Sequence, residues 1–242
     1  MGLGRRQWCG GVAAGVAALA CPRSARATLR SKVLIVGDSM VATSFGAELE
    51  SRLSKISALD ITRYGRSSSG LARPDFFDWM ARAQRLQARI NPEVVISMIG
   101  GNDAQALYAG PRSWIKWGTS EWETQYTQRL QEFRSLALPG KGTWISVGLP
   151  PMRLPKFDAK VEKIDRLRRQ TLERRAGGHF IETRALLAPN DEYQERLRVG
   201  DRVRRVRTED GIHLSLHGAK FLADHVEREV VQILSTAGVA RF

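Results

Sequence analysis

Short apolar runs alternate with longer amphipathic stretches along most of the chain. The runs are rich in Val and Ile and cover residues 32–36, 59–62, 94–99, 143–148 and 179–181. Apolar runs of this length are typical of strands that are buried on both faces of a parallel sheet. Five such strands alternating with helices predict a three-layer α/β/α sandwich with a mainly parallel five-stranded sheet.

The stretches between these runs have helical periodicity. After the first strand, one helical face combines four apolar residues, Val41, Phe45, Leu49 and Leu53. The last helix has a similar face, formed by Ala219, Leu222, Val226, Val230 and Ile233. A further helix is expected directly after Pro74, with Phe76, Met80 and Ala83 inward and its end at Asn91-Pro92.

Two segments have no clear period. Residues 104–120 carry Tyr108, Trp114 and Trp117, which fits either an aromatic lid that stacks on sugar rings or an insertion that packs its own cluster. The second segment is an irregular basic stretch that fits either a grip on an anionic polymer or a mobile, solvated loop. Its arginines are Arg196, Arg198, Arg202, Arg204, Arg205 and Arg207.

Residues 1–27 have the features of a secretory signal peptide. Arg5 and Arg6 begin it, a run of small apolar residues follows, and Ala25-Arg26-Ala27 matches a signal-peptidase site. The apolar run is too short for a transmembrane anchor. We therefore expect an exported, periplasmic protein with residues 28–242 as one mature domain. The general secretory route, the twin-arginine route and a lipoprotein linkage at Cys21 remain open.

Composition narrows the chemistry of that domain. The only cysteines, Cys9 and Cys21, lie in the predicted signal, which excludes a thiol nucleophile and a thiolate metal site. The chain has a formal net charge of +13, and the predicted signal contributes four arginines and no acid, so the domain itself is basic. In an exported protein, this charge favours acidic glycans, anionic lipid headgroups or cell-wall polymers over nucleic acid.

Three polar loops follow predicted strands and therefore meet at one edge of the sheet. They contain Ser39, Gly70 and Asn102, and Asp210 and His213 precede the last helix. Acyl transfer by a serine needs a hydroxyl, a base, a group that orients the base and donors for the oxyanion. Ser39, His213 and Asp210 fit the first three needs. The N–H groups of Ser39 and Gly70 and the amide of Asn102 fit the fourth.

Simpler roles exist for some of these residues. Taken alone, Ser39 fits a helix N-cap in an ordinary strand–helix turn. His213 and His217 are four residues apart and fit a metal pair, but the sequence places no third ligand near them, so neither metal nor cofactor is expected. Asp38 and Asp103 are expected to stabilise their loops by accepting backbone N–H groups.

Four blocks of the sequence resemble those of the SGNH/GDSL hydrolase superfamily. They are GDSM at 37–40, SSSG at 67–70, GGND at 100–103 and DGIH at 210–213, in the superfamily's order. The strings RSSSGLARPDFFDW and MIGGNDAQAL resemble a bacterial exported branch of unknown function. The resemblance implies an SGNH-hydrolase, flavodoxin-like fold, and related domains remove or transfer acetyl groups on envelope polysaccharides.

The resemblance also implies roles for individual residues. Ser39 would be the nucleophile, His213 the base and Asp210 its orienting acid. The oxyanion hole would combine Ser39, Gly70 and Asn102. The second block departs from the usual Asn-x-Gly-x-x-Gly, which makes Gly65 a rival to Gly70, and Met40 replaces the commoner Leu of the first block.

These observations predict a serine esterase of the cell envelope that removes acyl groups, above all O-acetyl, from a polysaccharide or an acylated small molecule. An acyltransferase with the same triad differs only in whether water or a sugar hydroxyl accepts the acyl group. The alternative of a different class is a non-catalytic envelope- or carbohydrate-binding module. Such a module would be expected to have lost one of the five site residues, and all five are present: Ser39, Gly70, Asn102, Asp210 and His213. The natural substrate and the oligomeric state stay open.

Overall fold

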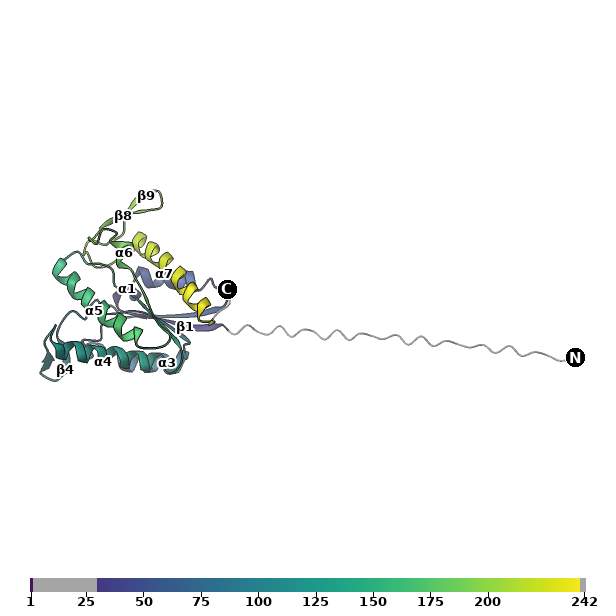
Figure 1. Ribbon diagram of the computed structural model, residues 1–242, viewed down its shortest axis with the longest axis horizontal. Helices are drawn as coiled ribbons and strands as arrows, with labels where there is room; N and C mark the ends of the chain where they lie inside the picture. The colour runs from purple at the N-terminus through teal and green to yellow at the C-terminus, as the bar shows by residue number, and fades with distance from the viewer. Residues whose placement is uncertain (2–29, 240–242) are drawn as a thin grey trace.

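A parallel five-stranded sheet forms the centre of the fold (Figure 1). The structure is a computed structural model that describes Met1 and residues 30–239, so the predicted cleavage site and both cysteines lie outside the described residues. The strands are β1 (Ser31–Gly37), β2 (Leu59–Gly65), β3 (Val94–Met98), β6 (Thr143–Val147) and β7 (Gly178–Ile181). Their order is β2-β1-β3-β6-β7, and every neighbouring pair is parallel, as predicted.

This strand order creates a switch point between β1 and β3. The chain leaves β1 toward β2 on one side and later returns to add β3 on the other. The loops that follow β1 and β3 therefore lead away in different directions from the carboxyl edge of the sheet, where open α/β sheets bind ligands. The predicted blocks around Ser39 and Asn102 come directly after these two strands.

Helices cover both faces of the sheet. On one face α2 (Ser44–Leu53) packs against α7 (Leu216–Thr236), and the short α1 (Ser39–Ala42) precedes them. The other face carries α3 (Trp79–Ile90), α4 (Ser120–Ala137) and α5 (Pro155–Glu173), which pack in that order. Figure 1 shows α7 above the sheet and α3 and α4 below it. The predicted three-layer sandwich is confirmed.

Burial explains why the central strands appear as unbroken apolar runs. Every residue of β3 and β6 is buried, because helices cover both faces of these strands. The four apolar residues predicted for the first helix are also buried, although Thr43 divides that helix into α1 and α2. Within residues 30–239, no helix has both the length and the apolar character needed to cross a bilayer.

The expected helix directly after Pro74 is wrong at its start. The helix begins at Trp79, because the Asp78 side chain caps it by accepting the N–H of Ala81 at 2.9 Å. Phe76, expected on the inner face, lies in the preceding turn and is 51% exposed. The predicted end of α3 at Asn91 is correct, since Asn91 adopts the left-handed conformation that often ends helices.

Two short hairpins replace the segments without clear periodicity. Residues 104–120 contain β4 (Leu107–Gly110) and β5 (Ser113–Ile115), whose Tyr108 and Trp114 rings meet edge to face at 5.2 Å. Of the two alternatives, this hairpin fits an insertion with its own aromatic cluster. The basic stretch forms β8 (Arg196–Val199) and β9 (Arg202–Arg205), followed by a buried Arg207, and is therefore not an irregular loop.

The packing around Gly65 leaves no space for a side chain. A Cβ built there would lie 2.3 Å from the backbone nitrogen of Ala42, so β2 approaches the end of α1 at backbone distance. We expect Gly65→Ala to lower the free energy of unfolding by about 1–3 kcal/mol, the usual cost of overpacking. Urea denaturation tests this, with exposed Ser51→Ala on α2 as the control. Equal stability of the two variants would contradict the close approach.

Candidate active site

Ser39 is the first residue of α1, directly after the end of β1. Asp38 occupies the N-cap position, and its Oδ1 accepts the N–H of Met40 at 3.1 Å. The simpler interpretation of Ser39 as the N-cap is therefore wrong, because the aspartate performs that function. The hydroxyl of Ser39 instead lies 2.8 Å from Nε2 of His213.

His213 joins Ser39 to Asp210. Its Nδ1 lies 2.7 Å from Oδ2 of Asp210, so the hydroxyl, both ring nitrogens and the carboxylate form one hydrogen-bonded chain. Asp210 and His213 share a turn before α7, and residues 39 and 213 meet only because the sheet brings the two chain ends together. Three of the residues predicted for the site are thus within hydrogen-bond reach of one another.

Asp210 is held ionised by its surroundings. Its other oxygen, Oδ1, accepts the Thr208 hydroxyl at 2.6 Å and the backbone N–H groups of Ile212 and His213 at 2.7 and 2.9 Å. Partial burial opposes ionisation, but the hydrogen bonds from His213, Thr208 and the backbone outweigh it and hold the pKa of Asp210 well below its usual range. Asp210 is therefore ionised at neutral pH, and its carboxylate can orient the ring of His213.

Asn102 and Gly70 lie together, in loops that follow β3 and β2. The side-chain amide of Asn102 donates one N–H to the carbonyl of Ser69 at 2.9 Å, in the peptide unit that contains the Gly70 nitrogen. A primary amide carries a second N–H that stays available. Among residues 30–239, the backbone N–H groups of Ser39 and Gly70 donate to no protein acceptor.

Gly70 and Gly65, the two rival glycines, have different surroundings. A Cβ on Gly70 would lie 2.1 Å from Oδ1 of Asp103, so the loop needs glycine to accept that carboxylate. Gly65 pairs with Gly37 within the sheet and packs against Ala42 of α1. Only the peptide of Gly70 is in contact with Asn102 through a hydrogen bond.

Two buried aspartates connect the loops of the site. Oδ2 of Asp38 accepts the N–H groups of Gly100 and Gly101, both at 3.1 Å, which ties the turn after β1 to the turn after β3. Asp103 accepts the N–H of Ala72 at 2.8 Å and the hydroxyl of Tyr126 at 2.9 Å, which ties the Asn102 loop to the Gly70 loop. Both aspartates bind backbone N–H groups as expected, but they bridge neighbouring loops.

Arg207 is a buried residue of the site that the sequence did not single out. It is fully buried, and its guanidinium donates to the carbonyls of Pro151 and Ile212, with longer contacts to those of Gly211 and His213. Burial lowers its pKa to about 10, which leaves it charged at neutral pH. Arg207 therefore fixes the backbone of the turn that carries Asp210 and His213. Only its position three residues before Asp210 separates it from the other arginines in the sequence.

The described residues offer no ready cation site. Among them, no three His, Cys, Asp or Glu side chains lie together as metal ligands. The two ring nitrogens of His213 are engaged by Ser39 and Asp210, and His217, its suggested partner, is exposed on α7. The arrangement is therefore suited to moving a proton between Ser39 and His213, next to several free N–H donors.

Comparison with solved structures shows which class of protein has this fold. The chain is similar to an acetyl esterase mutant crystallised with an acetate ion, with 14% identity, a TM-score of 0.57 and coverage of 86% of this chain and 99% of that chain. It is also similar to an acetylxylan esterase from Geobacillus stearothermophilus, with 19% identity, a TM-score of 0.55 and coverage of 84% of this chain and 96% of that chain. A GDSL-like lipase from Bacteroides thetaiotaomicron is similar with 13% identity, a TM-score of 0.54 and coverage of 84% of this chain and 88% of that chain. At these identities the similarity concerns the fold, which the chain shares with these two esterases and with the GDSL-like lipase, as predicted.

The family follows from the sequence. Residues 32–229 match the family described as "Protein of unknown function (DUF459)", and the chain belongs to that family. The matched region includes all four blocks around Ser39, Gly70, Asn102 and His213. A search of curated protein sequences found no significant match.

Asp38 predicts a pH dependence of stability. Burial, reinforced by the charge of Asp103 and offset by the backbone N–H bonds, raises the pKa of Asp38 from 3.8 to about 6. Between these two values, the unfolded chain loses a proton that the folded protein keeps, so rising pH favours unfolding there. We expect Asp38 to lower the free energy of unfolding by about 2 kcal/mol between pH 4 and pH 6.

Urea denaturation across this pH range measures the effect. Asp38→Asn has no titrating group at this position, so its unfolding free energy should depend less steeply on pH than that of the wild type. Parallel profiles for the two proteins would show that Asp38 does not titrate as described.

Arg207→Lys tests how the turn before α7 is fixed. A lysine ammonium cannot reach the carbonyls on both sides that the planar guanidinium binds, so buried carbonyls lose partners. We expect an unfolding free energy lower by about 1–3 kcal/mol. The downfield proton NMR signal of the hydrogen bond between His213 and Asp210 should also shift or broaden. Exposed Arg202→Lys is the control, and an unchanged NMR signal in Arg207→Lys would contradict the positioning role.

Proposed function

We propose that this protein is a serine esterase of the cell envelope that hydrolyses acyl esters, above all O-acetyl esters, on a glycan. The observation that carries the proposal is the unbroken chain of hydrogen bonds from Ser39 through His213 to Asp210. An ionised carboxylate only accepts hydrogen bonds, so Nδ1 of neutral His213 donates to Asp210. Nε2 is then free to accept the proton of Ser39, as a general base must.

The proposed reaction has two stages. Ser39 Oγ bonds to the ester carbonyl carbon while its proton passes to His213 Nε2. The imidazolium, stabilised by Asp210, then protonates the departing alcohol oxygen as the ester carbon–oxygen bond breaks. Water attacks the acyl-Ser39 ester, loses a proton to His213, and releases the carboxylic acid as the proton returns to Ser39.

Three N–H donors would stabilise the oxyanion of each tetrahedral intermediate. We assign them to the backbone of Ser39, the backbone of Gly70 and the second N–H of the Asn102 amide. None of the three is used by a protein acceptor among the described residues. Gly70 is preferred over Gly65 because Asn102 contacts the peptide of Gly70, whereas Gly65 packs against α1.

The openness of the site supports a polymer-bound ester as substrate. The side chains of His213 and Asp210 are 32% and 45% exposed, so an ester on a long chain can reach them without entering a deep pocket. Structures with the same fold include an acetylxylan esterase and a carbohydrate esterase of family 3. The signal-like features of residues 1–27 support a periplasmic location, where envelope glycans are accessible.

Turnover of a chromogenic acetyl ester by the full-length chain tests the proposal. Ser39→Ala and His213→Ala should each lower kcat by about 10⁴-fold or more, since the residues of such a triad act as a unit. Asn102→Ala should lower kcat by about 10²–10³-fold through loss of one oxyanion donor. His217→Ala, an exposed histidine on α7, is the matched control and should retain wild-type turnover.

A fluorophosphonate probe tests the nucleophile separately. It should label the wild type and leave Ser39→Ala unlabelled. Equal turnover by Ser39→Ala and the wild type would disprove the assignment of the nucleophile. Absence of both labelling and turnover in the wild type would instead favour a non-catalytic glycan-binding module. Release of the chromogenic alcohol only when a sugar hydroxyl is supplied, with the acetyl group recovered on that sugar and no free acetate formed, would identify an acyltransferase.

A further inference from the structure

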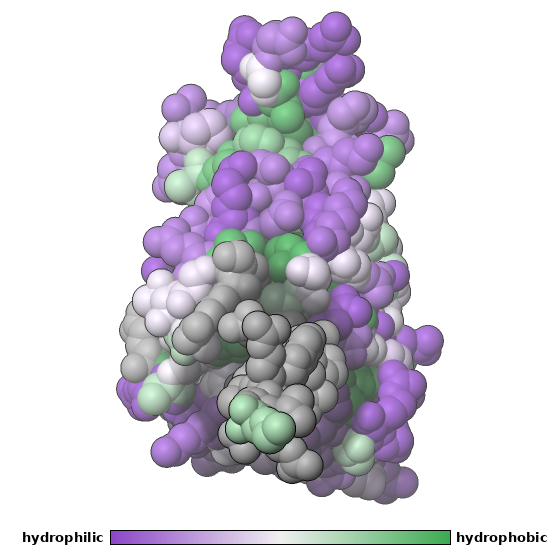
Figure 2. All heavy atoms as spheres, turned by 90° about the vertical axis from the view of Figure 1, so that its right-hand side faces the viewer, coloured by the Kyte–Doolittle hydropathy of each residue, from purple (hydrophilic) through white to green (hydrophobic). Residues whose placement is uncertain are grey.

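The β8–β9 hairpin carries a concentration of positive charge that the catalytic proposal does not use. It projects from the top of the molecule in Figure 1, and Figure 2 shows its surface as mostly hydrophilic. Residues 196–207 contain six arginines and one acidic residue, Asp201. So many like charges on a two-stranded hairpin repel one another, which costs stability unless a partner neutralises them.

Two of these arginines are held by strong partners within the protein, and Arg198 donates to the backbone carbonyl of Asp201 at 3.3 Å. Arg205 pairs with Glu195 at 2.7 Å and Glu209 at 3.4 Å, and Arg207 is buried among backbone carbonyls. Among the described side chains, Arg196, Arg198 and Arg204 form no ion pair, and Arg202 only approaches its exposed neighbour Asp201, at 4.0 Å. The hairpin therefore presents unneutralised guanidinium groups to solvent.

The strand register places these arginines on a definable surface. Arg196 and Arg198 share one face with Val203 and Arg205, whereas Arg202 and Arg204 share the opposite face with Leu197 and Val199. Leu197, on the other face, is partly buried against the core, which turns the Arg196–Arg198 face outward. Residues two apart on a strand are about 7 Å apart, which separates Arg196 from Arg198 along β8. Arg202, at the start of β9, is exposed on the opposite face.

The base of the hairpin is joined to the proposed catalytic turn. Glu195 O accepts the N–H of Val206 at 2.8 Å, and Ser215 binds Val206 O and Arg205 O at 3.0 and 2.6 Å. Val206 is followed by Arg207 and Thr208, which hold the turn of Asp210 and His213. A chain bound along the hairpin is thus held next to the proposed catalytic residues by a continuous, hydrogen-bonded segment.

We propose that the exposed arginines of the β8–β9 hairpin without a close ion pair, Arg196, Arg198 and Arg202, bind the carboxylates of an acidic polysaccharide, and that this polymer carries the ester that Ser39 attacks. The claim that the bound polymer carries the ester rests on the proposed esterase function. Guanidinium groups suit it because they bind carboxylates through two parallel hydrogen bonds. Separate donors that are spread over the hairpin and open to solvent fit a repeating anionic chain better than a single small anion.

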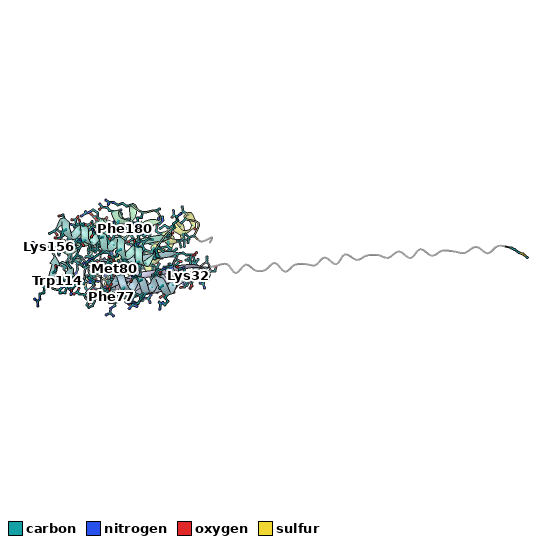
Figure 3. The ribbon with its side chains drawn as sticks, turned by 90° about the horizontal axis from the view of Figure 1, so that it is seen from below. Lys32, Phe77, Met80, Trp114, Lys156 and Phe180 are labelled. Carbon is teal, nitrogen blue, oxygen red and sulfur yellow. The ribbon has the colours of Figure 1, made fainter. Side chains whose placement is uncertain are left out.

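The other hairpin does not offer the same charge. Trp114 of β5 lies at the end of the molecule opposite Lys32, which is at the start of β1 (Figure 3). The Arg73 guanidinium stacks on its ring at 5.0 Å and is paired with Asp75 at 2.8 Å. The charge of Arg73 is thus already neutralised. Residues 107–116 contain two basic residues, Arg112 and Lys116, against six arginines in residues 196–207, so β8–β9 is the stronger candidate for an anionic chain.

Binding of fluorescent polygalacturonate to the full-length chain tests the inference without turnover. Ser39→Ala is the background, so the polymer stays intact. The triple substitution R196Q/R198Q/R202Q should weaken the Kd by about tenfold, since three modest ion pairs are lost together. The control R85Q/R89Q/R166Q removes the same charge from exposed positions on α3 and α5 and should change the Kd less than twofold. Added salt should weaken the wild-type complex.

Several outcomes would overturn the inference. Equal weakening by the two triple variants would show attraction to net charge only. Absence of polygalacturonate binding, or tighter binding of polyuridylate than of polygalacturonate, would reject an acidic polysaccharide as the partner. Circular dichroism with thermal unfolding of each triple variant distinguishes a lost binding surface from a lost fold.

A second measurement separates this inference from the esterase proposal. Acetylated polygalacturonate and acetylated xylan are matched acidic and neutral polymers. The ratio of their kcat/KM values should favour the acidic polymer in the wild type and fall by about tenfold in R196Q/R198Q/R202Q, through KM rather than kcat. Polymer binding without any ester turnover would leave the hairpin site standing and reject the esterase. Turnover with no preference for the acidic polymer would support the esterase proposal and reject the hairpin as the binding site of its substrate.

Discussion

The buried carboxylate of Asp38 is the contact on which the geometry of the site depends. It caps the helix that begins with Ser39 and, through its second oxygen, holds the glycines that precede Asn102. Each bond is to a backbone N–H group, so the turns after β1 and β3 are fixed in relation to one another. Because the capping task falls to Asp38, the Ser39 hydroxyl is left free for His213.

Buried charged groups and close backbone packing both hold the loops of the site in place around this contact. Asp103 holds the Gly70 loop against the Asn102 loop, and Gly70 must lack a side chain to allow it. On the opposite side of the site, the buried guanidinium of Arg207 fixes the turn of Asp210 and His213 through backbone carbonyls. Buried groups of opposite charge thus position the two halves of the site by binding backbone, while the residues proposed to react stay accessible.

The same arrangement connects the site to the molecular surface. The segment that holds the turn of His213 continues into β9, so the arginine-rich hairpin and the proposed catalytic base belong to one hydrogen-bonded unit. The β4–β5 hairpin makes a comparable connection on the other side, where the N–H of Tyr108 donates to Ala72 O in the Gly70 loop. Both insertions in the sandwich are therefore attached to loops of the site.

The sequence by itself determined the parallel sheet, because buried strands leave a local pattern. Its short polar blocks also singled out Ser39, His213 and Asp210, which the fold joins by hydrogen bonds. It misplaced the start of α3, since an aspartate cap at residue 78 is decisive only once the preceding turn forms. It could not separate Arg207 from its neighbours, because six arginines of one segment look alike until burial distinguishes them. Only the tertiary structure decided that Asp38, and not Ser39, caps the first helix, because that choice depends on Gly100 and Gly101, which are distant in the chain.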